Sequence, residues 1–280
     1  MIIFQKYYPD RVPSTIQLVF EGIIVALLGC FFASWLFPSE AGLIAVFLAA
    51  VASTDSIERL LGWHRRMIFD KTVSAARANG RLTARLMSLL LGTILGFCIV
   101  AIVLPTESLQ SLFAPQLREL SNTNFININF GHPGDIFFHN LYVMLFFFVI
   151  ALPFRQGGVM LAVAWNASVW AATFVTLSRN WAENHNIDFA NAFARIVAAT
   201  VPHMLIEASA YMVAGIAGVF VSKAFLRYAL ESERFGSVLR GAGMLLLIGL
   251  SLIAIGSLWE GLLAPQLATA LSHTSELQTH

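Results

Sequence analysis

Long stretches of uncharged, apolar sequence constrain this chain more than any other feature. Several runs of about 18 to 25 residues carry almost no charge, which is the length a helix needs to cross a hydrocarbon core roughly 30 Å thick. Apolar residues make up 58% of the 280 residues and charged residues only 12%. A soluble globule of this length could not bury so much apolar surface. The sequence therefore predicts an all-α bundle of about seven membrane spans, with the lipid bilayer as its surroundings.

Segments rich in proline, glycine or charge separate the apolar runs. The predicted spans are 15–36, 41–56, 86–104, 136–153, 157–177, 194–222 and 240–262. The second span is short, and its inner end, Ser53-Thr54-Asp55-Ser56, is polar. It is either a half-span or a helix that continues directly into a helix outside the bilayer. The first residues lack a short apolar run followed by a small-residue cleavage site, so we expect no cleaved signal peptide.

The lysines and arginines predict the orientation of the chain. If seven spans alternate sides, only Arg118, Arg179 and Arg195 of the 17 positively charged residues fall on the side opposite the N-terminus. Positive residues are retained on the cytoplasmic side of a membrane. We therefore expect the cytoplasmic (inner) membrane of a prokaryote, with the N-terminus inside and the C-terminus outside. The formal net charge is only +1, so nothing indicates a nucleic-acid partner.

Two connections carry features of their own. Residues 54–85 mix apolar with basic residues, which is typical of helices lying at the inner membrane surface. The basic residues of this membrane-surface segment are Arg59, Arg65, Arg66, Lys71, Arg77 and Arg81. A plain cytoplasmic helical connection is the simpler alternative. In the outer loop 105–135, the alternating apolar residues of 122–130 are typical of a short strand or a packed loop.

Polar side chains inside the spans are the candidate functional residues, because a charge at the bilayer centre costs about 2.5–3.5 kcal/mol. The predicted central polar cluster consists of Asn140, Asn166, His203, Glu207 and Glu260. His203 and Glu207 are four residues apart, so a helix places both on one face, with Tyr211 a further turn along. Pro202 removes a backbone donor just before them, so we expect the sixth helix to be broken there, by a kink or by a restart.

Three interpretations of these residues compete. They cross-link helices by hydrogen bonds, they line a path for a proton, ion or small substrate through a broken helix, or they belong to a metal-dependent intramembrane hydrolase. Zinc hydrolysis needs three protein ligands, and the sequence has no His-Glu-x-x-His pair. It also lacks a Gly-x-Ser-x-Gly elbow and a Walker loop. We expect no catalytic residue, no metal and no cofactor.

Small residues mark where helices approach each other closely. Gly92 and Gly96 form a Gly-x-x-x-Gly pair in the third span, and Gly215 and Gly218 lie in the sixth. Pairs of this kind allow two helix backbones to come into contact. Packing within the bundle is the expected role of all four glycines. A homodimer contact is the alternative for the first pair.

The spacing of the polar residues resembles that of a known family. Asn140 opens one span, Trp165-Asn166-Ala167-Ser168 lies in the next, and Pro202-His203 with Glu207 precedes Ala214-Gly215-Ile216-Ala217-Gly218. This order resembles the stage II sporulation protein M family of integral membrane proteins, and Glu260 is similar to the acidic residue of that family's final span. The chain departs from the family pattern at His139-Asn140, Asn166-Ala167 and Pro202-His203-Met204, where the family has Asn-Asn, Asn-Gly and Pro-His-Gly. The chain therefore resembles a divergent member of this family.

The resemblance covers roughly 86–266. It leaves 1–85 as an N-terminal two-span region with a basic helical segment, and 267–280 as a polar tail. It implies a non-enzymatic scaffold or regulator of membrane or periplasmic partners in envelope remodelling, because the namesake acts in engulfment with peptidoglycan-degrading proteins. The alternative is a permease or transporter subunit that moves a small solute, ion or lipid through the His203/Glu207 cluster. A continuous polar cavity reaching His203 would favour transport, whereas side chains sealed by packing would not.

Overall fold

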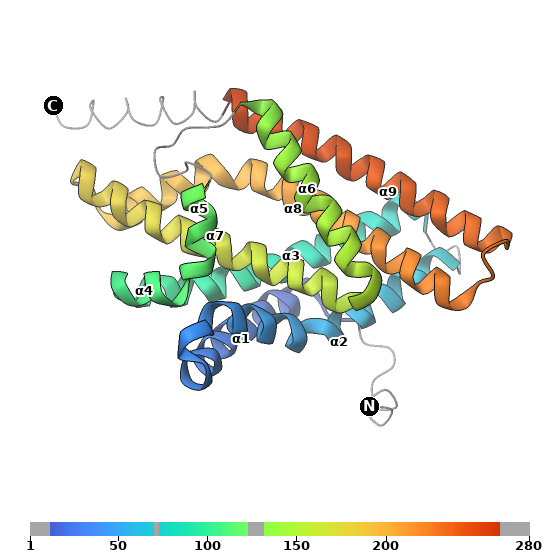
Figure 1. Cartoon of the computed structure of the whole chain (residues 1–280), viewed down its shortest axis with the longest axis horizontal. Helices are drawn as coiled ribbons and strands as arrows, with labels where there is room; N and C mark the ends of the chain where they lie inside the picture. The colour runs from blue at the N-terminus through green and yellow to red at the C-terminus, as the bar shows by residue number, and fades with distance from the viewer. Residues whose placement is uncertain (1–11, 70–72, 123–131, 264–280) are drawn as a thin grey trace.

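Long helices make up almost all of the structure, which is a computed structural model describing residues 12–69, 73–122 and 132–263 (Figure 1). In these ranges seven helices are long and apolar enough to cross a membrane. They are α1 (Thr15–Leu36), α2 (Ala41–Phe69), α3 (Ala75–Val103), α6 (Pro133–Phe154), α7 (Gln156–His185), α8 (Phe189–Arg227) and α9 (Glu233–Leu258). The predicted all-α, seven-span architecture is confirmed.

Short helical segments connect or extend the spans. They are η2 (Pro38–Glu40), α4 (Thr106–Leu112), α5 (Ala114–Asn122) and the π-helix η4 (Trp259–Leu263). The first part of the connection 105–135 is thus helical, and the buried Gln116 side chain of α5 bonds the carbonyl of Gly42 at 3.2 Å and the hydroxyl of Ser168 at 3.3 Å. The predicted strand or packed loop at 122–130 falls almost wholly outside the described residues, as does the tail 267–280.

Helix ends coincide with capping residues in the sequence. Ser14 and Gln17 form a reciprocal capping box at the start of α1. Ser74, Asp188 and Ser232 accept backbone hydrogen bonds at the starts of α3, α8 and α9. These caps satisfy amide groups that have no partner within their own helix.

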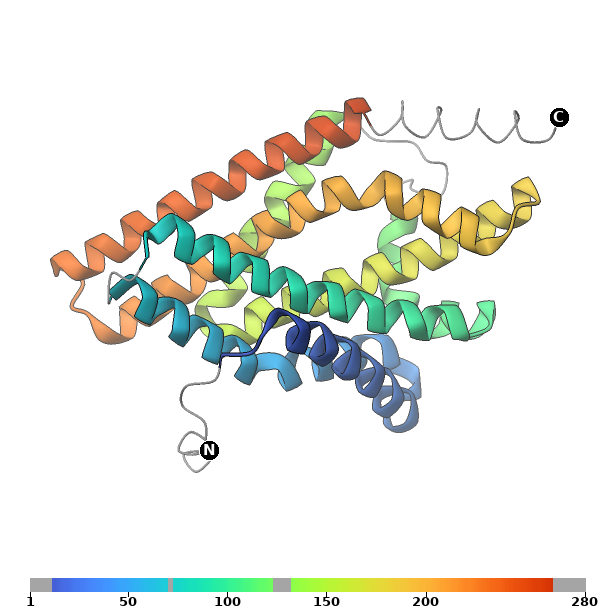
Figure 2. The ribbon, with the colours of Figure 1, turned by 180° about the vertical axis from the view of Figure 1, so that it is seen from behind.

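The spans form layers around α7 and α8. Helices α1 and α2 lie on one side of the molecule and α9 lies on the other, while α3, α7 and α8 run between them (Figures 1 and 2). Helix α1 packs on α3 and α2, whereas α6 and α9 both pack on α8. The middle helices are accordingly the most enclosed: among their 18 most apolar consecutive residues, 67% in α7 and 78% in α8 are buried.

The second span is one continuous helix, which was one of the two alternatives from the sequence. Helix α2 extends through Phe69, and its C-terminal half packs against the start of α3. The His64 Nε2 and Asn79 Oδ1 atoms are 2.6 Å apart, and the Arg85 guanidinium lies 3.9 Å from the centroid of the Trp63 ring. Leu60 is fully buried. Apolar residues of this segment thus contact protein, and the membrane-surface role of its basic residues stays a prediction.

The Gly-x-x-x-Gly pair of α3 packs against α1 of the same chain. A Cβ atom on Gly92 would collide with the backbone of Val19, and one on Gly96 would lie 2.7 Å from the Cβ of Ala26. A Cβ on Gly22 of α1 would in turn lie 2.5 Å from the Thr93 nitrogen. Helix α1 therefore occupies the surface that a homodimer contact through this pair would need.

The two glycines of α8 also lie at helix contacts. A Cβ on Gly215 would lie 3.1 Å from Val159 of α7, and one on Gly218 would collide with the Phe148 carbonyl of α6. The proposed boundary between an N-terminal region and a family-like core, at residue 85, falls inside α3. That division stays a prediction.

Helix α8 corrects one prediction from the sequence. It is continuous from Phe189 to Arg227 with Pro202 inside it, so the predicted restart, which would break the helix at this proline, is wrong. Figure 2 shows a continuous helix that curves along its length. Proline removes one backbone hydrogen bond, but transmembrane helices tolerate this loss where neighbouring groups and side chains compensate. Nearby, the Thr200 hydroxyl donates to the Ile196 carbonyl at 2.7 Å.

Candidate functional site

A buried hydrogen-bond chain joins α6 to α8. The side-chain nitrogen of Asn140 on α6 donates to Oε1 of Glu207 on α8 at 2.6 Å. The hydroxyl of Tyr211, one turn further along α8, donates to Oδ1 of Asn140 at 2.7 Å. Their exposed fractions are 5%, 8% and 5%, respectively. One amide on α6 thus serves both as donor and as acceptor to two polar groups of α8.

Glu260 brings a third element to this group. It lies in the π-helix η4 that follows α9, and it is 6% exposed. Gly256, one turn before Glu260, lies against the Glu207 side chain on α8. π-helical turns are rare and occur frequently at functional sites. The element η4 therefore contributes a second buried acid to this group.

The close approach of α9 to α8 depends on a glycine one turn before Glu260. A Cβ atom on Gly256 would lie 3.3 Å from Cγ of Glu207, which is tighter than ordinary van der Waals contact. A larger side chain at this position would displace either the carboxyl or the helix. Gly256 is thus part of the packing that holds the two acids near each other.

The neighbouring acids give the site its electrostatic character. Two ionised carboxylates in an apolar interior repel each other, and protonation of one of them or binding of a cation relieves that repulsion. The Asn140 amide and the Tyr211 hydroxyl add polar groups but no formal charge. The arrangement is therefore suited either to a hydrogen-bonded lock between helices or to binding a proton or small cation.

His203 lies on the same helix, one turn before Glu207, and it is 4% exposed. Its Nδ1 atom has no hydrogen-bond partner in the described part of the chain. The same holds there for the hydroxyl of Ser257 and the indole nitrogen of Trp259 on the α9 side. A buried polar group without a partner costs about 1–3 kcal/mol. The hydrogen bond between His203 and Glu207 that helical spacing allows is not formed, and these atoms are available to further polar groups.

Asn166 lies apart from the hydrogen-bonded group. It is half-buried on α7, and its side-chain nitrogen donates to the carbonyl of Ala162 in its own helix at 2.9 Å. A short polar side chain can satisfy itself in this way on the preceding turn. Of the five predicted residues, Asn140, Glu207 and Glu260 lie together, and His203 adjoins them along α8.

Tyr211 belongs to this group in the structure, although the sequence analysis did not assign it to the cluster. Its spacing of four from Glu207 and eight from His203 placed it on their helix face. That spacing gave no sign that its hydroxyl would reach Asn140, which lies 71 residues away in the chain. The contact depends on the packing of α6 against α8.

The polar cluster is sealed by packing. We use this name for Asn140, His203, Glu207, Tyr211 and Glu260, whose exposed fractions range from 4% to 8%. Hydrogen bonds link two helices, and Glu260 reaches the group from a third element. Side chains that are sealed in this way are expected if the cluster cross-links helices, and are not expected if it lines a transport path.

Known proteins offer no further assignment, because no family model, curated protein or solved structure matches this chain. The resemblance to the sporulation family therefore stays a prediction. What the fold establishes is a seven-span, multi-pass integral membrane protein that associates with the lipid bilayer.

Proposed function

We propose that the protein is a non-enzymatic membrane scaffold or regulator whose polar cluster holds α6 and the end of α9 against α8. The observation that carries this proposal is the enclosure of hydrogen-bonded groups from separate helices with at most 8% exposure. In an apolar environment such bonds fix the relative positions of helices. A fixed bundle of this kind can present constant surfaces to partners.

The proposed partners are membrane or periplasmic proteins of envelope remodelling. This part of the proposal rests on the resemblance of 86–266 to the stage II sporulation protein M family. The proposed location, the cytoplasmic membrane of a prokaryote with the N-terminus inside, rests on the distribution of positive residues. Neither part requires chemistry at the cluster.

Quantitative co-purification in mild detergent tests the scaffold. We compare the native protein with Glu207→Ala, which removes the acceptor for Asn140, and with Ser251→Ala as the control. Ser251 is exposed on α9 and bonds only the carbonyl of Leu247 in its own helix. We expect stoichiometric envelope proteins with the native protein and the control, and their loss with Glu207→Ala. Partners retained equally by all three forms would contradict a scaffolding role of the cluster.

Transport of a small cation or proton is the second candidate, favoured by the two buried acids Glu207 and Glu260. Buried acids in membrane spans often mark proton or ion pathways. Proteoliposomes loaded with a pH-sensitive dye test this idea. Glu207→Gln keeps an oxygen acceptor for Asn140 but removes the ionisable group. A proton flux in the native protein that this variant abolishes would favour transport, and equal, background flux in both would favour the scaffold.

A further inference from the structure

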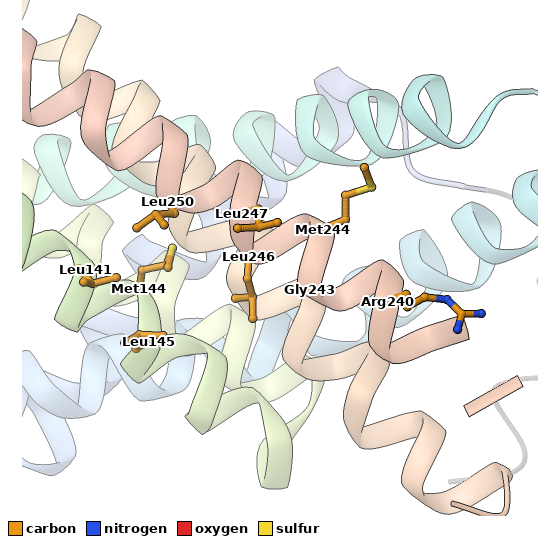
Figure 3. A pocket seen from close by; sticks show the side chains of 9 residues that line it. All are labelled: Leu141, Met144, Leu145, Arg240, Gly243, Met244, Leu246, Leu247 and Leu250. Atoms are coloured by element: carbon orange, nitrogen blue, oxygen red, sulfur yellow. The ribbon is translucent and has the colours of Figure 1, made fainter. Parts of the chain in front are cut away.

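An apolar groove of about 690 Å³ lies between α6 and α9 (Figure 3). From α6 it is lined by Leu141, Met144 and Leu145, and from α9 by residues that include Met244, Leu247 and Leu250. Arg240, also on α9, is its one charged lining residue. Figure 3 shows Arg240 at the end of the row of α9 side chains opposite Leu250. One end of the groove is therefore charged, and the rest of its lining is apolar.

The groove lies on the part of the bundle most open to lipid. Among the 18 most apolar consecutive residues of each helix, only 22% in α6 and 17% in α9 are buried. Met244 and Leu247 expose 68% and 64% of their surface. In a membrane, side chains so exposed contact acyl chains. A lipid is thus the natural neighbour of this groove.

Arg240 supplies the charge that recognises a headgroup. Its side chain is exposed, and it forms no ion pair or hydrogen bond with the residues that the structure describes. A guanidinium presents a fork of donors that matches phosphate oxygens. Basic residues near a membrane surface attract anionic lipids. The charge at this end of the groove therefore complements a phosphate group.

The length of the groove fits one leaflet. Arg240 and Leu250 are separated by ten residues of α9, which at 1.5 Å per residue is about 15 Å. Half of a hydrocarbon core of roughly 30 Å is the same length. A phosphate beside Arg240 would thus place the end of an acyl chain near Leu250. On the proposed topology this lipid belongs to the inner leaflet.

We propose that the α6/α9 groove is a binding site for one anionic phospholipid, with its phosphate on the Arg240 guanidinium and an acyl chain against Leu145, Leu247 and Leu250. Gly243 forms part of the groove wall, and a Cβ atom there would meet nothing within 4 Å. The wall therefore leaves room for the chain. Neither the scaffold nor the transport proposal is needed for this site.

Native mass spectrometry of the delipidated full chain, mixed with equal amounts of phosphatidylglycerol and phosphatidylcholine, tests the proposal. We expect preferential retention of phosphatidylglycerol by the native protein. Arg240→Gln should lower that preference about fivefold, corresponding to about 1 kcal/mol for one basic residue, and Arg240→Lys should keep most of it. The matched control is Arg234→Gln, an exposed arginine of α9 that does not line the groove.

Gly243→Phe tests the acyl-chain half of the site. The new ring should fill the groove and reduce retention of both lipids, while Gly241→Phe should not. Gly241 is the matched control because a Cβ there also meets nothing within 4 Å and it does not line the groove. Unchanged melting temperatures verify folding. The proposal is overturned if Arg240→Gln leaves the lipid preference unchanged, if Arg234→Gln lowers it equally, or if Gly243→Phe retains both lipids.

Discussion

The side-chain amide of Asn140 on α6 donates a 2.6 Å hydrogen bond to the Glu207 carboxyl on α8, across 67 residues of sequence. The carbonyl oxygen of the same amide accepts the Tyr211 hydroxyl. Loss of Asn140 would therefore leave two buried groups without partners at once. This makes Asn140 the most sensitive position for testing the cluster.

Replacing Asn140 by leucine should destabilise the fold by about 1–3 kcal/mol. Membrane hydrogen bonds average about 0.6 kcal/mol each, but buried groups that lose their partner cost about 1–3 kcal/mol. Unfolding in mixed detergent micelles measures the difference. The matched control is Asn166→Leu, because that amide bonds only within its own helix, and we expect a smaller loss there. Equal losses would argue against a special role for the α6–α8 bond.

Gly92→Ala should strongly weaken the packing of α1 on α3. The added Cβ would collide with the Val19 backbone, and overpacking of this kind costs about 1–3 kcal/mol. Gly80 lies on the same helix with nothing within 4 Å of an added Cβ. Gly80→Ala should be neutral or stabilising by about 0.5–1 kcal/mol, because glycine is entropically unfavourable inside a helix. The melting temperatures of both variants test this prediction. Similar values would mean that α1 and α3 move apart enough to accommodate the added Cβ at Gly92 without loss of stability.

Arg179 on α7 should stabilise the end of α3. Its Nη2 donates to the carbonyls of Ala101, Ile102 and Leu104 at 3.2, 3.1 and 2.8 Å. These carbonyls have no partner in their own helix, and a cation favours the negative end of the helix dipole. Arg179→Met should cost about 1–3 kcal/mol. Arg179→Lys should recover part of this, since it keeps the charge without the fork of donors. Identical melting curves for Met, Lys and native forms would refute the capping role.

Cysteine labelling tests the proposed topology. The two native cysteines are buried, at 3% and 6% exposure, so Cys30→Ala and Cys98→Ala provide a background. Glu231→Cys, in the turn between α8 and α9, should react only from the cytoplasmic side. Asn184→Cys, near the end of α7, should react only from outside. The reverse pattern in intact cells would invert the orientation inferred from the positive residues.

The sequence predicted the spans well, because length and hydropathy report directly on the cost of exposing polar backbone to lipid. It did not predict a continuous α8 through Pro202, since that continuity depends on the surrounding packing. The site was only partly predictable. Helical spacing placed Glu207 and Tyr211 on one face, but their joint contact with Asn140 depends on how α6 approaches α8.

A double-mutant cycle between Asn140→Leu and Glu207→Leu, measured as unfolding free energies in mixed micelles, tests the central claim most directly. If the polar cluster is a structural lock, the double variant should lose at least about 1 kcal/mol less than the sum of the single losses. Losses that add to within about 0.5 kcal/mol would show that the two side chains are not energetically coupled. That result would contradict the account of the cluster as the link between α6 and α8.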